Sequence, residues 1–523
     1  MLSLLTLSIG NNLKYDAVIF TDMNTKFWHS KPLGAYRVAT ELRKHGYSVK
    51  VLDYFGSWIE DPQVLFELLD LVIGDNTLFV GFSGVFFTPN KAPGTEIIRR
   101  WQDYEDMGEL TVWPLPQETM QDIFNRMRDR WPHIKLVYGG TNSNLKVKQL
   151  ISTMDYVVKG LADISAIELA DHLRKGSPVK FMPSGSRAKI IDYDTKATNF
   201  DFRHSMVEYT ETDHIVPGEV LTLETSRGCL FKCSFCGYPL IGRKKGDPDY
   251  HKTTESMANE LRKNWEEFGV DTYMFVDETF NETTTKIENV LRARDIAGVN
   301  LKFGCYLRID LVARFPEQLQ LLKQLGLVSA FMGIESFYKQ SAMAIGKSTD
   351  PEKVKETLFL MKQTIPGIKL IGGLIIGLPY DNPETLETWV PWVVSQDCPI
   401  DMPRFNPLYV EGTNSDIAKN PGNYGYTLYF DEASGKTLWR NQWWDQNQAR
   451  AYALRAMEQC WDTGRIRLAT WDLLGMHNYG YGPTDFDNIS IDQLDFVSIA
   501  QKKNQQWLDY QQSVFTYEKA QNV

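Results

Sequence analysis

The sequence predicts an α/β fold, in which a parallel α/β domain is followed by a partial (β/α)6 barrel and a mainly helical C-terminal region. Short apolar segments typical of buried parallel strands alternate with amphipathic helical segments up to about residue 410. The composition then changes, because six of the fourteen tryptophans lie beyond that point. We therefore expect three domains, at residues 1–200, 219–410 and 411–523.

The first domain is expected to be a Rossmann-like parallel sheet. Residues 33–46 form a predicted helix that ends at Gly46, since glycine commonly follows the last helical turn. An insertion between residues 87 and 118 is longer than a plain connection, so it is a candidate lid or packing element. Residues 161–218 are expected to form a helix and then a polar connection. The predicted strands are at residues 16–21, 47–52, 77–83, 134–140 and 154–160.

The second domain is expected to contain six β/α units. The helical pattern that includes Met257 has Thr254 as its candidate N-cap. In β/α barrels the reactive groups gather at the C-terminal ends of the strands, and the motifs described below lie at such ends. The predicted strands are at residues 220–225, 273–277, 301–308, 329–335, 370–377 and 404–410.

The third region carries aromatic residues at helical spacing. Leu454, Met457 and Trp461 fall on one face of a predicted helix. Helices packed under the barrel are the simpler interpretation, and a cap that shapes a substrate cavity with aromatic walls is the alternative.

Composition limits the classes of function. The net charge is −10, which argues against binding nucleic acid through a basic surface. No apolar run approaches the roughly 20 residues of a membrane span. The apolar segment at residues 1–9 lacks a basic start and a cleavage site, so we expect a cytoplasmic protein with free cysteines.

Three of the six cysteines form a Cys-x3-Cys-x2-Cys triad, at Cys229, Cys233 and Cys236. Thiolates are the usual ligands of a [4Fe–4S] cluster, which normally takes four, so three close together would leave one iron open to an external molecule. A disulfide does not suit an odd number of cysteines at short spacing. A zinc site would need a fourth ligand, and His251 is the nearest downstream candidate.

The triad resembles the signature of the radical SAM superfamily, and further motifs resemble its B12-binding-domain subgroup. The resemblance covers roughly residues 10–410 and implies a [4Fe–4S] cluster whose open iron binds S-adenosylmethionine (SAM) and cleaves it to a 5′-deoxyadenosyl radical. The residues that carry it are Arg227-Gly228, Phe235 before the last cysteine, Val276–Phe280, Arg308, Gly333–Ser336, Lys347 and Gly373–Pro379.

The resemblance also implies contacts with SAM. Arg308 would pair bidentately with the SAM carboxylate, and Glu335 and Ser336 would hold the ribose. Either Asp277 or Glu278 would contact the SAM amino group or the substrate, and Lys347 is a further charge partner. The remaining candidates for the SAM site are Phe235, Tyr238, and Gly373 and Gly377, whose backbone would approach the adenine.

The first domain resembles the cobalamin-binding domain of the same subgroup. Ser83, Gly139 and Gly140 stand where that domain has its serine and Gly-Gly elements. The cobalt-binding Asp-x-His-x-x-Gly motif is missing after the first strand, and His29 has the wrong spacing. Cobalamin would therefore be bound without a histidine ligand, an inference that rests on analogy of fold.

The leading hypothesis is a radical SAM enzyme that carries out cobalamin-dependent methylation of an unactivated carbon. The alternative is a cobalamin-independent oxidoreductase, cyclase or rearrangement enzyme that keeps the first domain as a scaffold. A non-enzymatic iron–sulfur electron carrier is the third. We expect a small-molecule or peptide substrate and a reductant such as flavodoxin or ferredoxin, and no membrane or nucleic acid partner. Cys305 is expected to be a buried thiol outside the barrel interior.

Overall fold

The computed structural model describes residues 14–22, 30–83, 87–88, 113–114, 117–140, 153–192, 200–216, 219–238, 242, 250–347, 350–410, 415–432, 436–463 and 496–522. Most of the insertion at 87–118, the segment 1–9 and the residues that follow Asp22 lie outside these ranges. None of the helices in the described ranges combines the length and the apolar character that a membrane span requires.

The N-terminal domain is built on a parallel sheet with the strand order β3-β1-β4-β7-β8-β9. The five predicted strands are confirmed, and β9 was missed because its four residues include only two apolar ones. The order reverses between β1 and β4, which is the switch point where doubly wound sheets bind ligands at the carboxyl ends of their strands. The strands are β1 (Ala17–Phe20), β3 (Val49–Leu52), β4 (Phe79–Ser83), β7 (Lys135–Gly140), β8 (Tyr156–Lys159) and β9 (Lys189–Asp192).

Helices cover both faces of this sheet. The helices α1 (Leu33–Lys44) and α6 (Ser165–Lys175) pack on one face, and α3 (Pro62–Val72) and α4 (Gln117–Arg130) pack on the other. Burial of both faces explains why the strands read as continuous apolar runs.

The second sheet is the predicted barrel, and its strands also run parallel, in the order β15-β14-β13-β12-β11-β10-β2. The six predicted strands are confirmed. A seventh, β2 (Ser30–Lys31), comes from the N-terminal part of the chain and pairs with β10. The others are β10 (Val220–Leu223), β11 (Thr272–Phe275), β12 (Lys302–Leu307), β13 (Leu327–Glu335), β14 (Lys369–Ile376) and β15 (Met402–Pro407).

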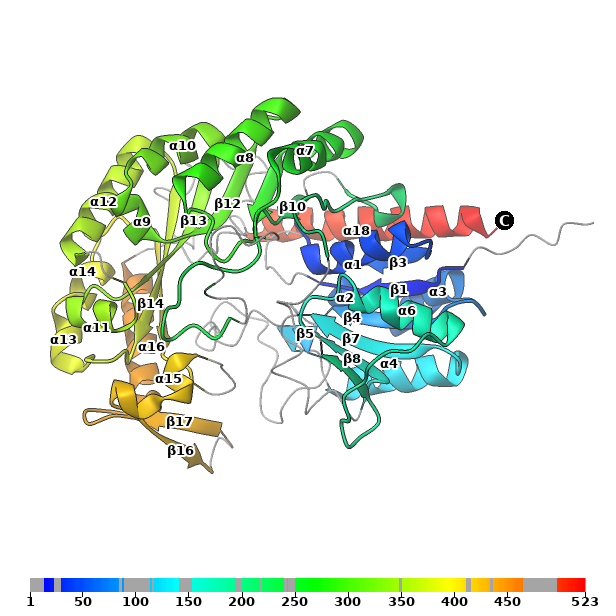
Figure 1. The fold of residues 1–523 in the computed structure, drawn as a ribbon, viewed down its shortest axis with the longest axis horizontal. Coiled ribbons are helices and arrows are strands. Elements are labelled where there is room, and N and C mark those ends of the chain that lie inside the picture. The colour runs from blue at the N-terminus through cyan, green and yellow to red at the C-terminus, as the bar shows by residue number, and fades with distance from the viewer. Residues whose placement is uncertain are drawn as a thin grey trace, which may run out of the picture.

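Helices cover the outer side of the barrel sheet, and its inner side faces the N-terminal domain (Figure 1). Side chains alternate along each strand, so Cys305 packs with the outer core while Tyr306 points to the inner side, as predicted for Cys305. The helix α7 is capped by Thr253, whose side chain accepts from the Ser256 amide, one residue before the predicted cap. The helices are α7 (Thr254–Phe268), α8 (Thr284–Ala297), α10 (Glu317–Leu325) and α12 (Pro351–Thr364).

The C-terminal region is mainly helical, but it does not pack as the single domain that we predicted. The hairpin of β16 (Thr427–Asp431) and β17 (Lys436–Arg440) and the helix α16 (Gln446–Asp462) lie against the barrel. The helix α18 (Phe496–Gln521) instead packs on the N-terminal domain (Figure 1). Its aromatic residues extend that domain's core, with Trp507 and Trp58 rings 4.7 Å apart.

Candidate active site

The cysteine triad lies on the loop that follows β10, at the carboxyl end of the barrel sheet. All three thiols are free, with Cys229 buried and Cys233 and Cys236 half-buried. Burial raises the pKa of Cys229 and Cys236, and the neighbouring thiols add to the shift, so the three sulfurs lie near one another. Within the described ranges, no three His, Cys, Asp or Glu side chains are close enough to share a single metal ion. Three neighbouring thiols suit a [4Fe–4S] cluster, whose ligands stand further apart than those of one ion.

Two side chains hydrogen-bond with the cysteine sulfurs, and Arg308 does so as the donor. The Arg308 Nη1 atom lies 3.4 Å from Cys233 Sγ, and the Thr279 hydroxyl lies 3.4 Å from Cys229 Sγ. Hydrogen bonds to cluster sulfurs are among the factors that set the reduction potential. Thr279 was missed in the sequence, although it lies within the Val276–Phe280 motif.

Arg308 ends β12 next to the cysteines, as predicted, but its bidentate face is already occupied. Its Nε and Nη2 atoms lie 3.1 and 2.7 Å from the two carboxylate oxygens of Asp310. The guanidinium also lies over the ring of Phe231, 4.0 Å from its centroid. The predicted bidentate pairing of Arg308 with SAM stays a prediction. Arg308 presents its Nη1 edge towards Cys233, and SAM would have to displace Asp310 to be held by both nitrogens.

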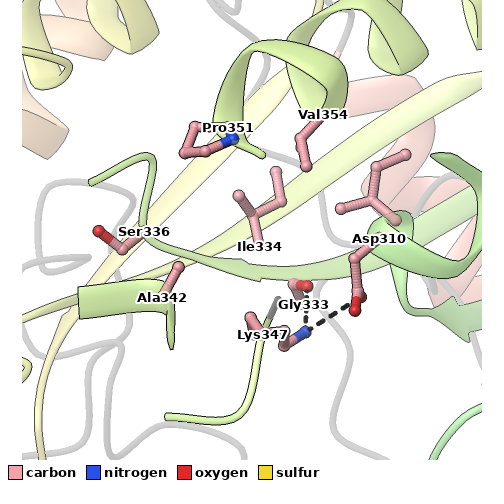
Figure 2. Close-up of a pocket in the computed structure, with 9 residues that line it drawn as sticks. Asp310, Gly333, Ile334, Ser336, Ala342, Lys347, Pro351 and Val354 are labelled. Atoms are coloured by element: carbon pink, nitrogen blue, oxygen red, sulfur yellow. Dashed lines mark hydrogen bonds and ion pairs between the residues drawn. The ribbon is translucent and has the colours of Figure 1, made fainter. Parts of the chain in front are cut away.

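Glu335, Lys347 and Asp310 form a buried charged group beside Arg308. The Lys347 Nζ atom lies 3.6 Å from Glu335 Oε1. It also lies 3.7 Å from Asp310 Oδ1 and donates to the Gly333 carbonyl at 2.7 Å (Figure 2). Burial raises the pKa of Glu335, whereas Lys347 and Arg308 outweigh burial and lower that of Asp310. Glu335 has φ of +68°, a conformation that side chains rarely adopt. The strained backbone of Glu335 at the end of β13 thus sets the direction of its carboxylate.

A small pocket opens at the same strand end (Figure 2). Gly333 lies close to the charged group, because a Cβ atom on it would lie 2.5 Å from Glu335 Oε1 and would displace that carboxylate. Ser336 is at the rim, but its hydroxyl accepts from the Tyr338 amide and so shapes the following turn. The pocket is lined by Ile309, Asp310, Gly333, Ile334, Ser336, Ala342, Lys347, Pro351 and Val354.

Asp277 and Glu278 point in opposite directions. Asp277 faces the outer helices, where it accepts from the amides of Thr225 and Ser226 at 2.7 and 3.1 Å and pairs with Lys286 at 2.9 Å. Its bonds brace the start of the cysteine loop. The prediction that either Asp277 or Glu278 contacts SAM or substrate stays a prediction, and the bonds of Asp277 make Glu278 the less engaged of the two.

Glu278 is the member of the pair that faces the site. It accepts from the Tyr238 hydroxyl, and among the described residues its buried Oε2 atom has no hydrogen-bond partner. Burial raises its pKa to about 7. A buried carboxylate oxygen without a hydrogen-bond partner is costly unless a ligand supplies the missing bond.

Phe235, in the cysteine loop, is half-buried against the core.

Gly373 of β14 and Gly377, which follows this strand, are both closely packed. A Cβ atom on Gly373 would lie 3.0 Å from the Phe331 ring, and one on Gly377, which has φ of +91°, would lie 2.5 Å from Trp439. Asp381 holds the turn after β14 by accepting hydrogen bonds from the Gly377 and Leu378 amides at 3.1 and 3.0 Å. This residue was not predicted from the sequence. Burial raises the pKa of Asp381 to about 7. Close approach of Gly373 and Gly377 to adenine stays a prediction.

Substituting Gly377 with alanine is expected to lower the free energy of unfolding by about 2–4 kcal/mol, through overpacking and backbone strain together. The matched control is Gly176→Ala, which has φ of +71° but open space around the added Cβ atom, so it reports the strain alone. Urea unfolding of both variants measures the difference. Equal losses would mean that Trp439 moves aside without cost.

The comparison with known families decides the identity of this site. Residues 223–392 match the model of the radical SAM superfamily. This part of the chain is a radical SAM domain. The matched range holds the cysteine loop, Glu278, Arg308, Glu335 and the turn after β14. Membership implies a [4Fe–4S] cluster and SAM as cofactors, and the three grouped free thiols fit the cluster.

The radical SAM domain is preceded by the N-terminal sheet, whose ligand-binding edge carries the three predicted cobalamin residues. Ser83 and Gly139 are register partners at the carboxyl ends of β4 and β7, and Gly140 follows with φ of +124°. They therefore lie together at the edge where this strand order places ligands. The loops that continue from these residues lie outside the described ranges.

Relatives of this radical SAM protein share its fold and parts of its sequence. TsrM of Kitasatospora setae, a radical SAM methyltransferase solved with cobalamin and a [4Fe–4S] cluster, matches with a TM-score of 0.61 and 16% identity over 94% of this chain and 99% of that one. At this identity the likeness shows a shared fold.

Two curated relatives match in sequence. An uncharacterized methyltransferase of Pyrococcus horikoshii is 26% identical over 48% of this chain and 55% of its own length. The hopanoid C-2 methylase of Rhodopseudomonas palustris is 24% identical over 46% of each. The chain thus spans about half the length of these curated relatives.

Proposed function

We propose that the chain is a cobalamin-dependent radical SAM methyltransferase that methylates an unactivated carbon of a small-molecule or peptide substrate. The main support is the direct contact between the N-terminal domain and the cysteine loop of the barrel. The loop that follows β8, at the ligand edge of the N-terminal sheet, is joined by its Asp163 to Arg227 of the cysteine loop at 2.7 Å. A fold shared along the whole chain with a cobalamin-bound methyltransferase supports the same interpretation.

The residues at this junction have separate roles in the proposal. Cys229, Cys233 and Cys236 would hold the cluster, while Ser83, Gly139 and Gly140 would let the cobalamin approach the N-terminal sheet. When bound, the cluster would supply electrons to SAM, and cobalamin would supply methyl transfer. The charged group of Glu335, Lys347 and Asp310, together with Glu278, would orient SAM and substrate from buried positions. A small electron-carrier protein such as flavodoxin or ferredoxin would be the reductant.

Anaerobic purification with added hydroxocobalamin tests this proposal. We expect a corrinoid absorbance spectrum with about one corrinoid per chain. Gly140→Leu is expected to reduce the bound corrinoid by about tenfold or more, since a side chain there would block close approach and strain the backbone. Gly46→Leu is the matched control, because Gly46 also has a positive φ but lies in open space at the end of α1. Absence of corrinoid from the wild-type chain would contradict the proposal.

A second candidate function is a cobalamin-independent radical SAM cyclase, oxidoreductase or rearrangement enzyme. The missing Asp-x-His-x-x-Gly motif favours it, because no histidine is available at the usual position for cobalt. A product without an added methyl group, formed by protein free of corrinoid, would support this candidate. An electron carrier would not need the buried carboxylates and Lys347 that surround the cysteines.

A further inference from the structure

Four buried charges meet where the N-terminal domain contacts the cysteine loop. We call this set the charge quartet: Arg37 of α1, Asp163 after β8, and Glu224 and Arg227 before the cysteines. Arg37 lies 3.0 Å from Glu224, Glu224 lies 2.9 Å from Arg227, and Arg227 lies 2.7 Å from Asp163. The ring closes between Asp163 and Arg37 at 4.0 Å. Each of the four residues is less than a tenth exposed.

Arg227 is the centre of this quartet, because its guanidinium is fully occupied. It donates from Nη1 and Nη2 to the two carboxylate oxygens of Asp163 at 2.7 and 2.9 Å, and from Nε and Nη2 to Glu224 at 3.1 and 2.9 Å. The Cζ atom of Arg227 lies 5.2 Å from the ring centroid of Phe200 and 4.6 Å from that of Phe202. A paired, planar site of this kind suits arginine and not lysine.

The charges in the quartet are balanced despite their burial. Burial opposes ionisation of Glu224, but the guanidiniums of Arg227 and Arg37 hold its pKa at about 2. The quartet thus brings two guanidiniums and two carboxylates together in a buried site. Removing one of them would leave its partner charged and buried, which is strongly destabilising at the site.

The quartet connects the two proposed cofactor sites by a short path. Asp163 lies four residues after Lys159, and Lys159 is the register partner of Gly140, the predicted cobalamin residue. Arg227 lies two residues before Cys229. The bidentate ion pair of Asp163 and Arg227 thus joins the carboxyl edge of the N-terminal sheet to the segment just before the first cysteine.

We propose that Arg227 and Asp163 are positioning residues that hold the cysteine loop in a fixed place on the ligand edge of the N-terminal sheet. The effect of a ligand bound at that edge is thereby transmitted to the cysteine loop. This second statement rests on the proposed function, whereas the first applies to the chain without any cofactor.

Hydrogen exchange of the cofactor-free chain tests the first statement. Asp163→Asn and Arg227→Lys are expected to speed amide exchange in residues 225–238 by about tenfold or more, because they break a buried ion pair. The matched controls are Asp213→Asn and Arg43→Lys, which break another bidentate pair, 2.7 Å long, between α1 and the segment before β10. The controls should leave exchange in residues 225–238 unchanged. Equal acceleration in both sets, or none in the first, would overturn the assignment.

Hydroxocobalamin is the probe for the second statement. Its binding is expected to slow exchange in residues 225–238 of the wild-type chain and of Asp213→Asn. In Asp163→Asn it should bind in the same amount but give no such protection. Protection that persists in Asp163→Asn would overturn the transmission, since a merely structural role predicts it. If the wild-type chain retains no corrinoid, transmission and the proposed function both fail, while the cofactor-free exchange still decides the role of Arg227 and Asp163.

Discussion

Replacing Cys233 with alanine is expected to remove the bound iron and to lower SAM turnover by at least about 100-fold, since loss of outer partners of a metal ligand alone costs 10–100-fold. Cys233 is also the thiol that accepts from Arg308, so its loss removes both a ligand and the contact that aims the guanidinium. Iron content and anaerobic SAM consumption of the reconstituted variant measure the effect.

Cys305→Ala is the control for that variant. Cys305 is fully buried on the outer side of β12, away from the cysteine loop, so its removal should leave the iron content unchanged. If Cys233→Ala kept wild-type iron and turnover, the assignment of the cluster to the Cys229, Cys233 and Cys236 triad would be wrong.

Replacing Lys50 with methionine is expected to lower the free energy of unfolding by about 3–5 kcal/mol, because it leaves a buried carboxylate unpaired. Lys50 lies on β3, and its Nζ atom is 2.7 Å from Glu518 of α18, with both side chains almost fully buried. Lys50 also contacts His214 Nε2 at 2.9 Å. Burial and the Lys50 charge lower the pKa of His214 to about 2, so His214 is neutral and accepts from the ammonium.

Denaturant unfolding measures the effect of Lys50→Met, and Lys175→Ala is its control. Lys175 lies 2.8 Å from Asp171, a similar distance, but this pair is exposed on one helix face, so its loss should cost only about 0.5 kcal/mol. A loss from Lys50→Met no larger than that of the control would show that α18 is not anchored to the N-terminal domain through Glu518.

The strands of both sheets could be predicted because they are buried on both faces. Segments such as residues 370–377 are continuous apolar runs, and such runs are readable without knowledge of their neighbours. The strands β2 and β9 could not be predicted in this way. The two polar residues of β2, Ser30–Lys31, carry no periodic signal, and β9 has only two apolar residues among its four. The docking of α18 on α3 likewise depends on contacts across more than 400 residues, which no local pattern reports.

The part of the candidate site that could be predicted is the part that lies in short sequence motifs. The three cysteines, Arg308 and Glu335 lie where their motifs placed them, at the strand ends beside one another. Partners such as Asp163 and Asp381 were missed, because each acts on a segment brought close only by folding. Asp163, for example, lies 64 residues before the arginine it binds.

The proposed function requires that the cluster and the corrinoid act together on SAM, and this requirement can be measured. The chain is purified anaerobically with and without hydroxocobalamin, reconstituted with iron and sulfide, reduced, and given SAM, and the S-adenosylhomocysteine released is counted. We predict release only when corrinoid and the intact cysteine triad are both present. Release that is unchanged without corrinoid, or none when both cofactors are bound, would contradict the account.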